Sequence, residues 1–230
     1  MHKFLPTIKE LNTCIAECRR CSRLVHFREN VPEKKQFAGQ TYWKKPVPGF
    51  GDPNAYLLIL GLAPSAQGGN RTGRIFTGDE SARFLFKALY EEGFASKPTS
   101  DGLHDGTELI GCYLTAAVKC VPPDNKPNAI EQKNCSPFLE NEFFLLKNLT
   151  SVLALGGFAF QAYLQYIKTH GGPKAAHRFA HGKKFNFEGF PHLYTCYHPS
   201  PQNTNTGKLS QAMLRKVLEQ IKYENDYIQP

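Results

Sequence analysis

Short apolar runs alternate along the chain with longer stretches in which apolar residues recur every three or four positions. The apolar runs, rich in β-branched and aromatic residues, cover about residues 55–62, 111–118, 151–155 and 192–197. The helical spacing covers about residues 80–92, 129–146, 157–170 and 207–223. Short strands that alternate with helices are typical of a parallel sheet covered on both faces. We therefore predict an α/β fold with four parallel strands.

The first 54 residues do not follow this pattern. Residues 1–30 have helical character and carry three cysteines, whereas residues 31–54 are rich in proline and glycine and predict an extended arm on the surface. A chain of 230 residues is long enough for one domain with a substantial core. We therefore expect a single domain over residues 1–230, with residues 1–54 as its N-terminal helix and arm.

Charge and hydropathy narrow the class of protein. The 28 Lys and Arg residues exceed the 20 Asp and Glu residues and give a net charge of +8. This excess suits a polyanionic partner, although many basic proteins bind none. The N-terminus lacks an apolar signal core, and no run approaches the roughly 18 apolar residues of a membrane span. We expect a soluble, cytoplasmic protein with no membrane partner.

Four of the seven cysteines have the spacing of a metal site. In a reducing compartment, cysteines favour metal binding over disulfides. Cys18 and Cys21 form a C-x-x-C pair, and Cys120 and Cys135 follow the second predicted strand. One shared site would tie the N-terminal segment onto the domain. Zinc and a four-iron cluster both suit four thiolates, and the spacing alone leaves both open, as well as no metal at all.

The three other cysteines have simpler explanations. Cys14 lies one helical turn before Cys18 and is a possible substitute ligand. Cys112 and Cys196 lie in apolar predicted strands, where a cysteine usually serves as a small buried hydrophobic residue.

A glycine-rich loop, GLAPSAQGGNRTGRIFTGDES, joins the first predicted strand to the following helix. α/β proteins place ligands at such strand ends, and glycine lets the backbone approach a ligand closely. The loop lacks the G-x-G-x-x-G pattern of dinucleotide binding, and residues 205–209 match a P-loop only partly. A nucleotide-binding enzyme is therefore disfavoured.

Three segments carry a resemblance to a known family. GLAPSAQGGNRTGRIFTGD, YLTAAVKCVPPDNKP and HPSPQNTNTG, with the four cysteines, closely resemble the type-b uracil-DNA glycosylases, the fifth family of the uracil-DNA glycosylase superfamily. The likeness runs from Cys18 to the final helix. It implies a three-layer α/β/α sandwich around a central four-stranded parallel sheet. It also implies a structural [4Fe–4S] cluster on Cys18, Cys21, Cys120 and Cys135.

The resemblance implies an enzyme that hydrolyses the N-glycosidic bond of uracil in double-stranded DNA and so begins base excision repair. We expect it to act as a monomer at the nucleoid of a prokaryotic cell. Because the bond is inaccessible in a duplex, the nucleotide must swing out into a pocket. The pocket needs an aromatic platform, a donor for the departing base and a positioned water.

Three residues suit these tasks. Phe76, a large aromatic residue in a polar loop that we expect to lie apart from the main core, is the candidate platform. His198 is the candidate donor to the base, and Asp79 is the candidate that orients or activates water. Each has a structural alternative: Phe76 would anchor the loop, His198 would brace its own loop, and Asp79 would cap the next helix.

Other positions concern recognition of the base. Ala116 stands where related families have an asparagine that reads uracil, which implies a broader set of bases, including hypoxanthine and xanthine. Asn125 is a candidate replacement amide or a plain turn residue. Gly61 and Ala63 complete the expected base pocket, and Ala63 is apolar where other branches carry a polar or acidic residue.

Two segments are candidates for DNA contact. Gly69, Asn70 and Arg71 offer backbone donors and a cation for phosphates, which position DNA without specifying its sequence. The tripeptide Pro201, Gln202 and Asn203 is a candidate wedge for the gap left by the extruded base, or a plain turn.

A second function class fits part of the pattern. An iron–sulfur protein that binds nucleic acid and senses redox state would explain the cysteines and the basic charge. It would not explain why Phe76, Asp79 and His198 follow the ends of two predicted strands.

Overall fold

Four buried strands form the centre of the computed structural model, which describes residues 6–174 and 176–226. These strands are β2 (Leu57–Gly61), β3 (Cys112–Ala116), β4 (Ser151–Leu155) and β6 (His192–Cys196). They run parallel in the order β3-β2-β4-β6. The predicted parallel core is confirmed.

The sheet has two further strands that the sequence pattern missed. β1 (Phe50–Gly51) pairs antiparallel with β3, and β5 (Lys184–Phe185) pairs antiparallel with β6. The sheet is therefore six-stranded, with the order β1-β3-β2-β4-β6-β5. A two-residue strand is too short to show alternation, so hydrophobic periodicity cannot reveal it.

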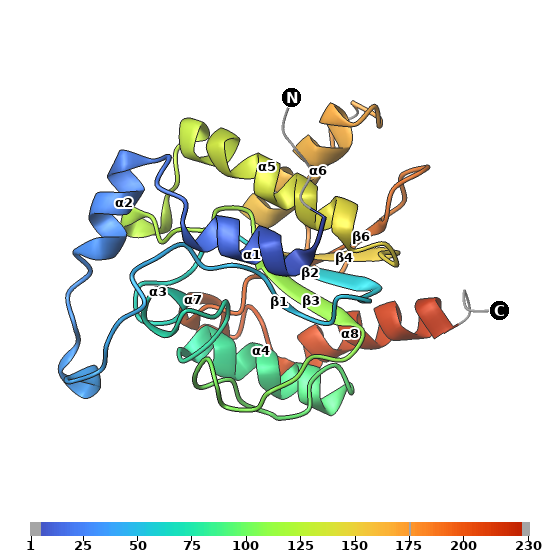
Figure 1. Ribbon diagram of the computed structural model, residues 1–230. Helices are drawn as coiled ribbons and strands as arrows, with labels where there is room; N and C mark the ends of the chain where they lie inside the picture. The colour runs from blue at the N-terminus through green and yellow to red at the C-terminus, as the bar shows by residue number, and fades with distance from the viewer. Residues whose placement is uncertain (1–5, 175, 227–230) are drawn as a thin grey trace.

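Helices cover both faces of this sheet, as Figure 1 shows. One face carries α4 (Glu80–Glu91) and α8 (Gln211–Asp226), and the other carries α1 (Ile8–Ala16), α5 (Ala129–Leu145) and α6 (Gly157–Thr169). Alternate residues of β2 serve the two cores: Leu57 and Ile59 pack with α4 and α8, whereas Leu58 and Leu60 pack with α5 and α6. This alternation follows from the period of two in a strand. The sandwich predicted from the resemblance is confirmed.

The N-terminal region is two helices rather than one. α1 ends at Ala16 and α2 (Ser22–Glu29) begins directly after Cys21. The break places Cys18 and Cys21 in the connection between them. The arm that follows contains a 3-10 turn, η1 (Lys35–Phe37), and buries Tyr42 and Val47 against the rest of the fold. The single-domain organisation itself stays a prediction.

Three short elements lie in the loops that concern function: α3 (Gly69–Thr72), η2 (Pro123–Asn125) and α7 (Pro201–Thr204). Among the described residues, no helix is both long enough and apolar enough to cross a membrane.

Candidate active site and cysteine cavity

Parallel strands bring two distant loops to one edge of the sheet. Gly61 ends β2 and pairs in register with Ala116 at the end of β3, and Cys196 ends β6 two residues before His198. The glycine-rich loop and the loop after β6 therefore leave the sheet at the same edge. This is the edge at which open α/β sheets bind ligands.

Phe76 lies across the end of β2. Its φ of 47° is unusual for a residue with a side chain, and a Cβ on Gly61 would come within 2.9 Å of the Phe76 ring. Gly61 is therefore required for the ring to lie where it does. Phe76 is 9% exposed and belongs to the same core cluster as Ala116. The expectation that it lies apart from the main core is corrected, because the ring covers that core's edge.

His198 meets Phe76 from the other loop. The two ring centroids are 6.0 Å apart and the planes are tilted by 32°. Asn203 donates from Nδ2 to the His198 carbonyl at 2.8 Å, which closes the loop behind the imidazole. Gly156, with a φ of 92°, leaves the space beside His198, since a Cβ there would lie 3.3 Å from the His198 Cβ.

The environment keeps His198 uncharged. Burial lowers the pKa of His198 below its usual value, and the negative charge of Asp79 opposes that shift without reversing it. The imidazole is therefore neutral near pH 7 and retains one N–H to donate. A neutral donor next to an aromatic face suits a ligand that develops negative charge.

Both oxygens of Asp79 are engaged. Oδ1 accepts from the Ala82 amide at 2.9 Å and caps α4, while Oδ2 accepts from the Ser65 hydroxyl. The same hydroxyl accepts from the Gly68 amide at 2.9 Å. A Cβ on Gly68 would lie 2.3 Å from Asp79 Oδ2, so glycine is needed there. The capping role is observed, and it orients the carboxylate.

Ser65 is a residue that the sequence analysis missed. The sequence pattern that could have identified Ser65 is its position three residues before Gly68 in a loop. At such short spacings serine side chains often accept hydrogen bonds from backbone amides.

The predicted base-recognition residues separate into two groups. Gly61 lies against the Phe76 ring and pairs with Ala116, which belongs to the same core cluster as Phe76. Ala63 instead packs toward the cluster that contains Cys120 and Cys135. Asn125 is exposed at the end of η2 with a φ of 55°. That conformation is typical of a turn residue, and its role as an amide for the base stays a prediction.

The three residues predicted to contact phosphates, Gly69, Asn70 and Arg71, face inward. This corrects the expectation that they offer their polar groups to DNA. Gly69 is buried against Pro64, and Asn70 is 1% exposed and donates to the Arg28 carbonyl. Arg71 donates from Nη2 to the Gly78 carbonyl at 2.8 Å and lies 3.8 Å from the centre of the Phe37 ring. These groups support the loop from within, because its many buried polar atoms need partners.

The predicted wedge, residues 201–203, forms the start of the short helix α7. Pro201 and Gln202 are exposed, whereas Asn203 is half-buried with its amide turned back to His198. The tripeptide is therefore the first turn of a short helix, and two of its three side chains face solvent. Its contact with DNA stays a prediction.

An ion pair between buried Arg74 and half-buried Asp105 supports the glycine-rich loop from behind. Arg74 is 3% exposed and donates to Asp105 at 2.5 Å, Ser100 at 2.7 Å and Thr77 at 3.0 Å. Burial acts to raise the pKa of Asp105, but the hydrogen bonds from Arg74 and nearby amides outweigh it and hold the pKa far below the usual value. The loop at residues 96–107 is thereby tied to the loop that carries Phe76.

The four predicted ligand cysteines line one small cavity. Cys18 and Cys21 come from the connection between α1 and α2, Cys120 from the loop after β3, and Cys135 from α5. Within the described ranges, no group of three His, Cys, Asp or Glu side chains is arranged to hold a single metal ion.

The donor set of this cavity suits a thiolate-bound centre. Arg28 donates to Cys120 Sγ at 3.0 Å, and Asn134 approaches Cys21 Sγ at 3.4 Å. Donors of this kind stabilise negative charge on sulfur. Burial raises the pKa of Cys120 to about 11 and that of Cys135 to about 12, and Arg28 opposes this shift at Cys120.

The remaining cysteines lie elsewhere. Cys14 is exposed on α1, and Cys112 and Cys196 are fully buried in strands. The prediction that Cys112 and Cys196 are core residues is confirmed.

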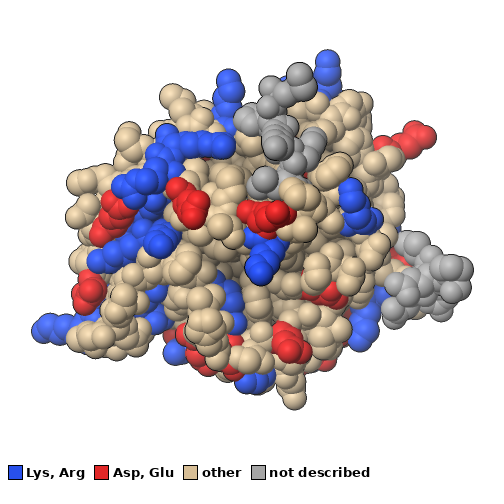
Figure 2. Space-filling model, in the orientation of Figure 1, with Lys and Arg blue, Asp and Glu red and all other residues tan. Residues whose placement is uncertain are grey.

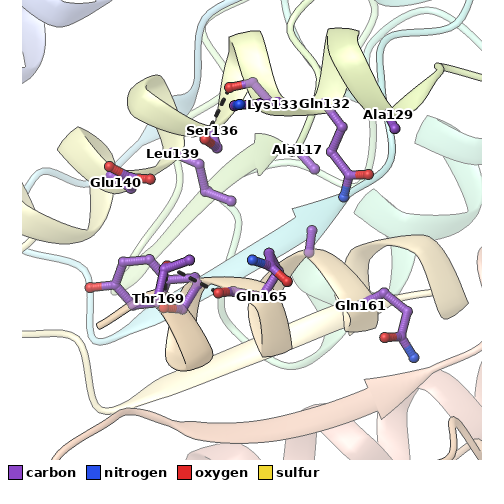
Figure 3. A pocket seen from close by; sticks show the side chains of 12 residues that line it. Ala117, Ala129, Gln132, Lys133, Ser136, Leu139, Glu140, Gln161, Gln165 and Thr169 are labelled. Carbon is purple, nitrogen blue, oxygen red and sulfur yellow. Dashed lines mark hydrogen bonds between the residues drawn. The ribbon is translucent and has the colours of Figure 1, made fainter. Parts of the chain in front are cut away.

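A larger hollow is lined in part by Ala117 and Ser136, which directly follow Ala116 and Cys135 in sequence. Figure 3 shows this cavity of about 570 Å³ between α5 and α6, where Gln132, Gln161 and Gln165 surround a floor that includes Ala117. It contains none of the predicted site residues.

Comparison with known proteins agrees with this architecture. The model of the uracil DNA glycosylase superfamily matches residues 48–222, which is most of the chain. The chain therefore belongs to the uracil DNA glycosylase superfamily.

Three relatives show to which family within the superfamily the chain belongs. The type-5 uracil-DNA glycosylase of Thermus thermophilus is 48% identical over 90% of this chain and 94% of its own. Those of Pyrobaculum aerophilum and Mycobacterium bovis are 46% and 44% identical, over 89% and 94% of this chain and 87% and 81% of their own. Within the superfamily, the chain belongs to the type-5 uracil-DNA glycosylases, and the predicted family is confirmed.

Proposed function

We propose that this protein removes uracil from double-stranded DNA by hydrolysing the bond between N1 of the base and C1′ of the sugar. The observation that carries the proposal is the meeting of Phe76 and His198, which come from loops far apart in sequence, at 6.0 Å. Asp79, whose charge acts on His198, belongs to the same site. The names of the relatives and the family match support the choice of base.

The reaction breaks one bond and forms another. The C1′–N1 electron pair leaves with the base, whose negative charge spreads over N1 and O2, while C1′ becomes oxocarbenium-like. Water then adds its oxygen to C1′ and releases a proton. The products are free uracil, once the base is protonated, and an abasic site. The protein must therefore stabilise an anion and place a water.

His198 is the residue that we assign to the departing base. A neutral imidazole N–H aimed at O2 would stabilise the developing negative charge without losing its own proton. Such preorganised donors act strongly because they need no rearrangement as the charge forms. The lowered pKa of His198 favours this neutral form.

Asp79 is the residue that we assign to the water. Its cap on α4 and its bond to Ser65 hold the carboxylate in one orientation. Carboxylate oxygens have more than one acceptor position, so these bonds leave capacity for a water. The water's proton would pass to the carboxylate as oxygen adds to C1′.

We also propose a broad range of damaged bases, including hypoxanthine and xanthine. Ala116 is 2% exposed, belongs to the same core cluster as Phe76, and offers only a methyl group. A site without a buried amide leaves no polar group unpaired when a different base enters, and it therefore discriminates weakly.

The glycosylase assay that tests this function uses duplexes carrying uracil, hypoxanthine or xanthine opposite each normal base. We expect alkali-labile breaks at each damaged base, with uracil opposite guanine the fastest because a mismatch is easiest to unstack. DNA binding without breaks would instead support a non-catalytic iron–sulfur sensor. A single-stranded substrate and sedimentation of the protein alone test the preference for duplex and the monomeric state.

We further propose that Cys18, Cys21, Cys120 and Cys135 hold a [4Fe–4S] cluster. The shared cavity and the donors that face its sulfurs support this proposal. When bound, the cluster would supply a cross-link between the N-terminal segment, the loop after β3 and α5. The steps of base excision do not pass through it.

Two cysteine variants test the cluster. Cys120→Ala should lose iron and the visible absorbance of a cluster, because one thiolate is missing. Cys112→Ala is the matched control, since Cys112 is also buried but lies in a strand and does not line the cavity. Stoichiometric zinc in colourless wild-type protein would contradict the assignment.

A further inference from the structure

Arg28 is a buried cation that forms one wall of the cysteine cavity. It lies near the end of α2 and is 2% exposed. Its Nη1 donates to Cys120 Sγ at 3.0 Å and to the Cys18 carbonyl at 3.2 Å. One guanidinium nitrogen therefore contacts two of the segments that supply the cysteines.

The charge of Arg28 is poorly balanced by carboxylates. Its ion pair with Glu29 is long, 3.9 Å, and Glu29 is already bonded to Arg19 at the surface. Among the described residues, Arg28 Nε has no hydrogen-bond partner. A buried charge is costly unless it is paired. The nearest hydrogen-bond partners of the Arg28 guanidinium are instead the Cys120 sulfur and the Cys18 carbonyl of the cavity.

Lys119, which lines the same cavity, differs from Arg28 because a carboxylate fully balances its charge. It is 1% exposed, and its Nζ lies 2.8 Å from both carboxylate oxygens of Glu142. Lys119 thus has a complete internal partner, whereas Arg28 has sulfur and a carbonyl. Of the three described cations that line the cavity, Arg20, Arg28 and Lys119, it is Arg28 whose side chain donates a hydrogen bond to a cysteine sulfur.

The backbone of Arg28 leads to the candidate active site. Its carbonyl accepts from Asn70 Nδ2 at 3.1 Å, and Asn70 is a 1%-exposed residue of α3. The next residue, Arg71, donates to the Gly78 carbonyl, directly before Asp79. A short series of hydrogen bonds therefore joins the cysteine cavity to the residue assigned to the water.

We propose that Arg28 and Asn70 are positioning residues that couple the occupied cysteine cavity to the glycine-rich loop. The Arg28 guanidinium binds the cysteine wall, and its carbonyl holds α3 through Asn70. The position of α3 in turn sets that of Asp79 and Phe76. This inference rests on the proposed cluster and the proposed excision, and it assigns the cluster a specific route to the catalytic loop.

Asn70→Ala tests the connection without touching the cavity. We expect the iron content and the cluster absorbance of the wild type. Local loosening of the loop should make the single-turnover excision rate about 10-fold lower, with little change in KM, and should speed the hydrogen exchange of amides in residues 69–79. If Asn70 only supported the fold in general, its loss would not speed hydrogen exchange selectively in residues 69–79. Wild-type rate together with wild-type exchange would overturn the connection.

Arg28→Gln tests the contact with the cysteines. We expect iron loss to a chelator about 10- to 100-fold faster, in line with the typical effect of outer hydrogen-bond partners of metal ligands, and slower excision. Arg28→Lys, which keeps the charge, should fall between. If the Gln variant fails to fold by circular dichroism, the Lys variant decides. Iron retention as in the wild type would overturn the role of Arg28.

Two comparisons separate this proposal from the proposed function. Arg215→Gln removes a surface arginine from α8 that pairs with Glu92, and it should match the wild type in iron retention and loop exchange. If the wild-type protein excises no uracil, the proposed function fails. Iron retention in Arg28→Gln and hydrogen exchange in Asn70→Ala still test whether the cavity and the loop are coupled. In Arg28→Gln/Asn70→Ala, coupling predicts a fold-loss of rate smaller than the product of the two single fold-losses.

Discussion

The candidate active site and the cysteine cavity lie near the same edge of the sheet but are held together differently. Asp79, Ser65 and Gly68 belong to one loop and satisfy one another through short-range hydrogen bonds. The cavity depends on contacts between distant segments: Arg28 reaches Cys120, and Arg23 of α2 reaches Glu131 of α5.

This difference predicts different consequences of mutation. A change within the loop should affect the chemistry more than folding stability, because the local backbone keeps its other bonds. A change at the cavity should affect stability first, because it frees whole segments that are far apart in sequence. Basic side chains gather around α2 on the face shown in Figure 2, so loosening this segment would also disturb a charged surface.

Asp79→Asn should give the largest effect on the loop side. Removing a general base typically costs about 10²–10⁴-fold in rate, whereas asparagine caps a helix about as well as aspartate. We therefore expect strongly reduced single-turnover excision with an unchanged free energy of unfolding in denaturant. A normal rate with lost stability would instead leave Asp79 as a cap alone.

Lys119→Met should give the largest effect on the cavity side. It leaves Glu142, which is fully buried, without its cation, and breaking a buried pair typically costs about 3–5 kcal/mol. The measurement is the free energy of unfolding in denaturant. The double variant Lys119→Met/Glu142→Leu should recover much of the loss, and a double variant no more stable than the single one would contradict the charge argument.

His198→Ala should slow excision by about 10²–10³-fold, the typical effect of losing one preorganised donor to a developing anion. Its folding stability should change little, because the loop is also closed by Asn203. Single-turnover rates together with thermal unfolding measure both quantities. An unchanged rate would assign the departing base to another donor.

Asp105→Asn should cost about 1.5–3 kcal/mol at neutral pH, since it weakens hydrogen bonds to a charged group. The pKa of Asp105 is held far below its usual value in the folded protein. Its contribution is therefore fully present above the unfolded-state pKa of about 3.9 and is lost as pH falls further toward the folded-state pKa. Unfolding curves from pH 7 to pH 3 should show the gap between wild type and variant narrowing below about pH 4. A gap that widens in acid would contradict this assignment.

Much of the fold was determined by the sequence alone. The four parallel strands, the start of α4 at Glu80 and the start of α5 at Ala129 follow from local periodicity and capping residues. The residues Phe76, Asp79 and His198 could also be selected from sequence, because each follows a strand end in a loop with glycine or proline. Which face of a helix or strand is buried depends on the hydrophobic periodicity of that segment itself, so the segment's own sequence is enough to predict it.

Only the tertiary structure decided where the loop side chains point. Asn70 and Arg71 resemble surface groups in sequence, yet both are directed inward, and Phe76 completes a core rather than standing outside it. The two edge strands and the link from Arg28 to Asn70 were equally invisible. The physical reason is that an irregular segment has no periodicity of its own. Its buried polar atoms take partners from whatever distant segments the fold brings next to them.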